Sequence, residues 1–354
     1  MFLAWKEMRY EKLRYTLIIA MIVLISYLIF ILTSLAQGLA RQNTDAIKSW
    51  DIQNVILNDN ANTSMTQSII TKSQLNKVQI GKKTAIVTQV PVVVRGDGNS
   101  KVSAQFVGVN SKQFIMKNLK VTEGKKPIKA NEVLADSSLK QAGYQIGDEI
   151  KLNSGQTNYL ISGFVNNEKL NIAPVIYGAN SVAKVLKNAG PTFAASAIVS
   201  QGSKIILSKD SGLKNYSVGE FIKKLPGYSA QLTTFIFMIG FLMIISLVVV
   251  AVFLYILTMQ KLENYAVLRA QGVPVGVLVR ATISQSLLIV ISGLIVGTAL
   301  TGLTASFIPS EVPMYFSIPL LSIVAIGLVV VALLGVIIPI RVVTRVDPVT
   351  VIGG

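Results

Sequence analysis

Four side chains at helical spacing lie where a polar region meets a long apolar run. They share one face if residues 228–238 are helical: Tyr228, Gln231, Phe235 and Met238. Tyr228 offers a phenolic oxygen as a ligand, and Phe235 and Met238 form an apolar, polarisable wall on the same face. The same residues also fit a tyrosine at the membrane interface above an ordinary packed helix. The residues alone leave both interpretations open.

Other reactive residue types are missing, because the sequence contains no Cys and no His. Disulfides, thiolate metal sites and Cys nucleophiles are therefore excluded. Zinc hydrolases and His-based triads are excluded too, since His is the commonest general base and metal ligand. The phosphate-binding pattern G-x-x-x-x-G-K-[ST] is also absent. We expect no catalytic residue, no metal and no cofactor of its own.

Four charge-free runs dominate the sequence, at 15–40, 229–260, 281–310 and 312–340. Each exceeds the roughly 20 apolar residues that cross a bilayer. Mean hydropathy of +0.57 also places the chain among membrane proteins. Proton relays and ion-coupled carriers usually need a charged residue inside a span. We therefore expect any transport to draw its energy from a partner.

The predicted fold is four transmembrane α-helices with an extracellular α+β domain inserted between the first and second. The predicted segments, in order, are an interfacial helix (1–14), helix 1 (15–40), the α+β domain (41–228), helix 2 (229–260), a coupling loop and helix (261–280), helix 3 (281–308), an outer loop (309–316), helix 4 (317–340) and a tail (341–354).

Lys and Arg near the membrane predict the orientation. Four basic residues lie within 1–14, three within 261–280 and two within 341–354, whereas 309–316 holds only Glu311. We expect a multi-pass cell-membrane protein with both termini cytoplasmic and the inserted domain outside.

The insert has the alternation of strands at 84–95, 101–110 and 157–166, and a helical pattern at 180–190. It carries 24 Lys and Arg against 12 Asp and Glu between residues 41 and 228, a net charge of +12. This charge fits a solvated basic surface, or attraction to anionic lipid or substrate. Nucleic acid is not an expected partner, because the domain faces outward.

The 261–280 loop predicts a short amphipathic helix. Leu262, Tyr265, Ala266 and Arg269 share one face, and Gly272 followed by Pro274 can end the helix. Such a helix suits docking to a cytoplasmic protein, or simply connects two spans. In the next span, Gly293 and Gly297 form a small-xxx-small pair that allows close helix contact.

Residues 266–272, AVLRAQG, resemble the coupling segment of FtsX/MacB-type permeases of ABC transporters. The tail RVDPVTVIGG resembles the ending of these permeases, and residues 131–152 with 159–165 resemble their outer domain. The chain is identified as a member of this family. The resemblance implies contact with a partner ATPase through Leu262, Tyr265, Ala266, Arg269, Gly272, Asp347 and Pro348.

A nearer resemblance is to the haem-transport permeases of Gram-positive bacteria, at residues 1–15, 35–43, 255–261 and 346–354. It implies haem (hemin) as substrate, a second copy of the chain, membrane lipid around it, and a cytoplasmic ABC ATPase that uses ATP. We favour export, for haem detoxification. Two alternatives are MacB-like export of an antimicrobial peptide, lipid or lipoprotein, and FtsX-like signal transmission without a transported substrate.

Without His or Cys, the haem iron is left with Tyr, Met or carboxylate oxygen as ligands. The candidates are the 228–238 face and, more weakly, Tyr27. Some members of the branch carry a carboxylate where this chain has Gln231. Because an amide is a poor iron ligand, this departure favours Tyr228.

Overall fold

The computed structural model describes residues 12–202, 205–309 and 312–345. Asp347, Pro348 and most of the predicted 1–14 helix lie outside these ranges. The chain forms two compact units. We call Leu39–Gln231 the inserted domain, and Met1–Gly38 with Leu232–Gly354 the helical unit.

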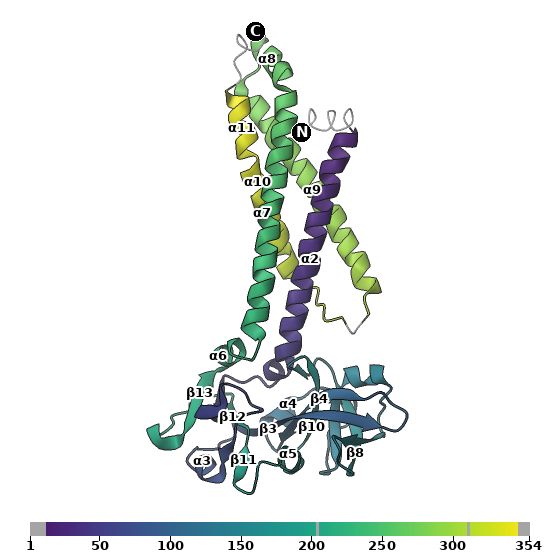
Figure 1. Ribbon diagram of the computed structural model, residues 1–354, viewed down its shortest axis with the longest axis vertical. Coiled ribbons are helices and arrows are strands. Elements are labelled where there is room, and N and C mark those ends of the chain that lie inside the picture. The colour runs from purple at the N-terminus through teal and green to yellow at the C-terminus, as the bar shows by residue number, and fades with distance from the viewer. Residues whose placement is uncertain (1–11, 203–204, 310–311, 346–354) are drawn as a thin grey trace. The chain divides into compact units, whose positions relative to one another are not determined.

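Four helices of the described chain are long and apolar enough to cross a membrane, which confirms the predicted fold class (Figure 1). They are α2 (Lys12–Ser49), α7 (Tyr228–Gln260), α9 (Val275–Phe307) and α10 (Ile318–Gly335), which α11 (Ile337–Thr344) follows. α8 (Leu262–Ala270) joins α7 to α9. α9 begins before residue 281 because Pro274, with φ −61°, starts the helix there.

Small residues set the packing of the helical unit. A Cβ atom on Gly297 would lie 2.3 Å from Ser26 Oγ, and one on Gly293 would lie 2.5 Å from Ile22 Cγ2. The small-xxx-small pair therefore brings α9 against α2 within one chain. The loop before α10 is held similarly: a Cβ atom on Gly38 would lie 2.0 Å from the Pro313 carbonyl oxygen.

The inserted domain is built on an 11-stranded mixed sheet in the order β13-β1-β12-β3-β4-β10-β6-β8-β5, with β9 pairing β10 and β7 pairing both β3 and β8. Its strands are β1 (Asn54–Asn58), β3 (Thr84–Gly96), β4 (Val102–Val109), β5 (Val121–Gly124), β6 (Glu132–Asp136), β7 (Glu149–Leu152), β8 (Asn158–Val165), β9 (Lys169–Leu170), β10 (Ala173–Ala179), β12 (Ala197–Ser200) and β13 (Leu213–Ser217). Smaller elements are the β2–β11 pair (Ile70–Thr71, Phe193–Ala195), α3 (Lys72–Asn76), α4 (Phe114–Asn118), α5 (Asn180–Lys187) and α6 (Val218–Lys223).

The double pairing of β7 closes six strands into a ring, β3-β4-β10-β6-β8-β7. An apolar cluster built largely from these strands includes Phe106, Ile150 and Phe164. The strands predicted at 84–95, 101–110 and 157–166 are β3, β4 and β8. The helix expected to reach Gly190 ends earlier, at Lys187, because Asn188 adopts a left-handed conformation with φ 49°.

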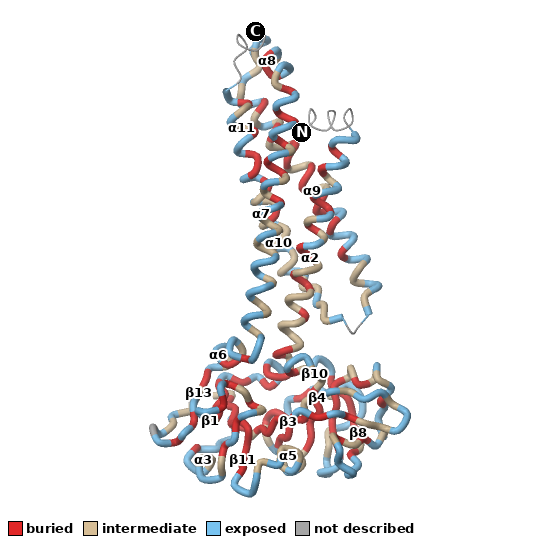
Figure 2. The backbone as a smooth tube through the Cα atoms, viewed as in Figure 1, coloured by how far each residue is buried: buried red, intermediate tan, exposed pale blue. Residues whose placement is uncertain are grey.

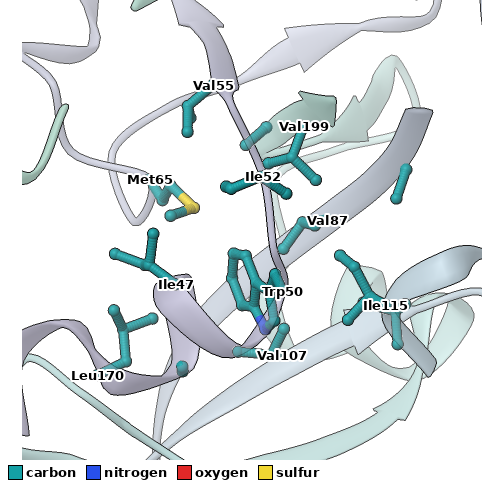
Figure 3. Packing of buried hydrophobic residues seen from close by; sticks show 14 of the residues in the cluster. Ile47, Trp50, Ile52, Val55, Met65, Val87, Val107, Ile115, Leu170 and Val199 are labelled. Atoms are coloured by element: carbon teal, nitrogen blue, oxygen red, sulfur yellow. The ribbon is translucent and has the colours of Figure 1, made fainter. Parts of the chain in front are cut away.

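A second cluster joins the sheet to the last turns of α2. Trp50, which directly follows α2, is fully buried and packs among Ile47, Val87, Val107 and other apolar side chains (Figure 3). Burial is dense through the sheet of this domain, whereas α7 has few buried residues, all in its C-terminal half (Figure 2). The end of α2 is therefore part of the core of the inserted domain.

Candidate substrate face and coupling elements

Tyr228 begins α7 and belongs to the inserted domain. Its half-buried ring packs against the Trp50-containing core cluster. Among the described residues its hydroxyl makes no hydrogen bond. Lys224, just before it, pairs with Glu220 at 2.7 Å, and this carboxylate raises the pKa of Lys224.

Gln231 has a structural contact of its own. Its Oε1 accepts a hydrogen bond from Asn43 Nδ2 of α2 at 3.3 Å, across 188 positions of sequence. This bond joins the first and last helical segments of the inserted domain. The amide thus has a role in packing that needs no substrate.

The remaining face residues continue along α7. Phe235 is half-buried and Met238 is 42% exposed, so both keep apolar surface open to lipid or ligand. Tyr27, the weaker candidate, shares a 2.9 Å hydrogen bond between its hydroxyl and Thr304 Oγ1 of α9. Ligation by Tyr27 would compete with that bond.

The predicted coupling helix is α8, and its apolar stripe faces its own chain. Tyr265 and Ala266 are buried, and Tyr265 clusters with Leu278 of α9 and Val343 of α11. Leu262 and Arg269 are half-buried. The side chains open to a partner are instead those of Glu263, Asn264, Val267, Ala270 and Gln271. Tyr265 and Ala266 therefore attach α8 to the helical unit and do not present a surface.

The end of α8 is fixed by its backbone. Gly272 has φ +87°, its N–H donates to the Arg269 carbonyl, and the Val273 N–H donates to the Leu268 carbonyl, both at 3.0 Å. These two bonds form a Schellman motif, which requires a left-handed residue at Gly272. The structure places Gly272 where a glycine helix stop was predicted, with Pro274 starting α9.

A buried polar contact fixes the other end of α8. Lys261 is 8% exposed, and its Nζ donates to the Tyr15 hydroxyl of α2 at 3.1 Å. Gln285 of α9 donates to the same hydroxyl. The ammonium also lies 5.7 Å from the centre of the Tyr15 ring. This contact, unpredicted from sequence, ties the α7–α8 junction to both α2 and α9.

A second buried network anchors α2 in the inserted domain. Trp50 Nε1 donates to the Tyr177 hydroxyl at 2.9 Å, and that hydroxyl donates to Glu168 Oε2 at 2.6 Å. Ser49 Oγ donates to the same carboxyl oxygen at 2.9 Å. Burial raises the pKa of Glu168 to about 8, so this acid is largely protonated at neutral pH. Burial, and then Glu168, raise the pKa of Tyr177 well above its usual value.

Two family models match separate parts of the chain. The FtsX-like permease C-terminal model matches residues 236–348, and the MacB-like periplasmic core domain model matches residues 16–183. The chain is an ABC transporter permease of the FtsX/MacB type. Nearly the whole of both matched regions lies within the described residues.

The curated relatives of this permease match it along its full length. Two of them are described as "Putative hemin transport system permease protein HrtB". The protein of Staphylococcus haemolyticus is 26% identical to this chain over 99% of each chain, and that of Staphylococcus epidermidis is 24% identical, also over 99% of each chain. An uncharacterized ABC transporter permease of Mycobacterium tuberculosis is 21% identical over 100% of this chain and 99% of its own.

Two solved domains are also similar. The periplasmic region of MacB from Actinobacillus actinomycetemcomitans is 16% identical with a TM-score of 0.33, covering 47% of this chain and 90% of that one. The extracellular domain of YknZ is 13% identical with a TM-score of 0.31, covering 45% and 84%.

Proposed function

We propose that this permease moves haem outward across the cell membrane and thereby relieves haem toxicity. It works as two copies with a separate HrtA-like cytoplasmic ATPase. The observation that carries the proposal is the similarity to proteins described as hemin transport permeases, at 26% identity over 99% of both chains. The two family models support the part of the proposal that makes the chain an ABC permease of the FtsX/MacB type.

Dependence on a partner ATPase is supported by the sequence and by α8. The chain has no phosphate-binding loop motif of its own. α8 is packed on α9 and α11 through Tyr265 and held to α2 through Lys261. A push on the exposed side of α8 would therefore move several membrane helices together, since packed elements transmit displacement.

We propose that the movement of α8 displaces α2. Its last turns enter the core of the inserted domain, where Trp50 is packed on every side and hydrogen-bonded to Tyr177. A movement of α2 cannot leave this domain unaffected without breaking the Trp50 contacts. The same anchoring would serve an FtsX-like signal transmitter, so function in cells must separate the two.

Tyr228 is the proposed haem ligand. Its hydroxyl is unengaged among the described residues, and the face it begins continues through Phe235 to Met238. The test is a hemin titration of the permease–ATPase complex in nanodiscs, followed by the Soret band. Tyr228→Phe should lose the ligand-dependent Soret shift, whereas Tyr255→Phe, at an exposed tyrosine of the same helix, should keep it. An unchanged spectrum in Tyr228→Phe would refute the ligand assignment.

Two measurements separate haem export from its alternatives. Hemin should stimulate ATP hydrolysis by the complex, and antimicrobial peptides, lipids and lipoproteins should not. A deletion strain should lose hemin tolerance and recover it with the intact gene. Normal hemin tolerance with altered cell chaining would instead identify a signal transmitter.

A further inference from the structure

A cavity of about 370 Å³ lies in the inserted domain where two neighbouring parallel strands, β4 and β10, both end. Its lining comes from residues 109–111 at the end of β4, residues 178–181 at the end of β10 and the start of α5, residues 127–130 before β6, and Met116 of α4. The volume is in the range of small-ligand or side-chain pockets.

One wall of this cavity is held in shape from behind. Glu132 Oε2 accepts hydrogen bonds from the backbone N–H groups of Ile128 at 2.7 Å and Lys129 at 3.3 Å. These bonds lower the pKa of Glu132, so its carboxylate stays ionised and continues to accept both hydrogen bonds from the loop. The loop nevertheless leaves Ile128 80% exposed. The fixed loop therefore presents one large apolar side chain to solvent beside the cavity.

The surface around this wall is strongly basic. Residues 111–130 contain six lysines and a single acid: Lys112, Lys117, Lys120, Lys125, Lys126, Lys129 and Glu123. Glu123 is already paired with Lys140. Lys129 lines the cavity itself, and four of the other lysines lie within two positions of a lining residue. The charge therefore selects an anionic occupant.

One further feature distinguishes between kinds of anion. The apolar part of the wall, formed by Val109, Met116, Pro127 and Ile128, calls for an apolar side chain.

We propose that this cavity binds an acidic peptide segment of a partner protein, with an apolar side chain seated against Ile128. A peptide supplies both groups: carboxylates for the lysines and an apolar anchor for the wall. Polyphosphate or another simple polyanion supplies only the first. The site is independent of the proposed haem face and of α8, and it gives the inserted domain a binding role of its own.

The test is fluorescence anisotropy on the full chain in nanodiscs of zwitterionic lipid. The probe is a fluorescein-labelled peptide Asp-Glu-Leu-Asp-Glu, compared with a version carrying Gly for Leu and with unlabelled polyphosphate as competitor. The Leu peptide should bind, and the Gly peptide should bind about tenfold more weakly because it lacks the buried apolar side chain. Binding should weaken as salt rises.

Variants locate the binding. Ile128→Ser should weaken the Leu peptide about tenfold, and Lys129→Glu about fivefold. The matched controls Ile146→Ser and Lys101→Glu change exposed residues of the same types outside the cavity and should stay within twofold. The proposal is overturned if the peptide does not bind, if both cavity variants bind like wild type, or if Leu and Gly peptides bind equally and polyphosphate displaces both.

Discussion

Glu168 and Lys187 should change the stability of the inserted domain in opposite directions as pH rises. Replacing either one by a neutral residue should therefore expose the pH dependence that the other causes. Burial raises the pKa of Glu168 from 4.5 to about 8, and burial lowers the pKa of Lys187 from 10.5 to about 8. Lys187 is held by oxygen atoms, notably Thr66 O at 2.8 Å and Ser196 Oγ at 2.7 Å. Both groups lie within the inserted domain.

The sign of each effect follows from which state binds the proton. Folded Glu168 keeps a proton that the unfolded chain has lost, so its stabilising contribution is complete below pH 4.5 and is lost as pH rises to about 8. Folded Lys187 releases its proton at about pH 8, whereas the unfolded chain keeps it to 10.5, so stability is regained over that window.

The magnitude comes from about 1.4 kcal/mol for each pH unit over which only one state binds the proton. Between pH 7 and pH 9, loss of the Glu168 contribution lowers the free energy of unfolding by about 1.4 kcal/mol. Lys187 raises it by about 0.7 kcal/mol, once its shift is halved for partial exposure to solvent. Between pH 7 and pH 9 the free energy of unfolding of the wild type should therefore fall by about 0.7 kcal/mol. That of Glu168→Gln should rise by about 0.7 kcal/mol, and that of Lys187→Met should fall by about 1.4 kcal/mol.

Trp50 provides the assay. The chain has two tryptophans, so a Trp5→Phe background leaves Trp50, which is fully buried, as the fluorescent reporter of this domain. Urea titrations of the full chain in nanodiscs at pH 7 and pH 9 give the free energies. The control Glu149→Gln changes an exposed carboxylate and should follow wild type. The reasoning fails if Glu168→Gln also follows wild type between the two pH values.

Three further substitutions test the packing described above. Gly297→Val should destabilise the α2–α9 contact by about 1–3 kcal/mol through overpacking and lower the thermal midpoint in nanodiscs, whereas Gly302→Val, with open space around it, should not. Gly38→Val should displace the loop at Pro313, seen as faster amide exchange in residues 312–317, and unchanged exchange would contradict it. Trp50→Ala should cost about 3–5 kcal/mol and make the inserted domain sensitive to protease, so a fully resistant variant would count against the anchoring of α2.

The membrane helices could be predicted because length and absence of charge are enough to identify them. The first helix was predicted to end at residue 40, but α2 continues to Ser49, and no proline interrupts it there. Strand alternation located β3, β4 and β8. The closing of the ring by β7 was not accessible, because its pairing with both β3 and β8 depends on distant register rather than on local pattern.

The coupling helix and the buried polar network could be predicted from the sequence only in part, for a related reason. Helical spacing placed Tyr265 and Ala266 on an apolar stripe, but spacing cannot tell whether a stripe is covered by its own chain or by a partner. The structure covers it with α9 and α11. The hydrogen-bond network of Ser49, Glu168 and Tyr177 joins residues that lie far apart in the sequence. No local sequence motif could therefore have predicted this network.

The hydrogen bond between Asn43 and Gln231 has a consequence for the history of this permease. The segments by which the chain enters and leaves the inserted domain are neighbours in space, although 188 positions separate them in sequence. A domain whose two ends meet can be placed within a loop without rearranging the elements on either side. The domain can therefore be remodelled between these two ends while the four membrane helices keep their packing, as long as the last turns of α2 still fit its core.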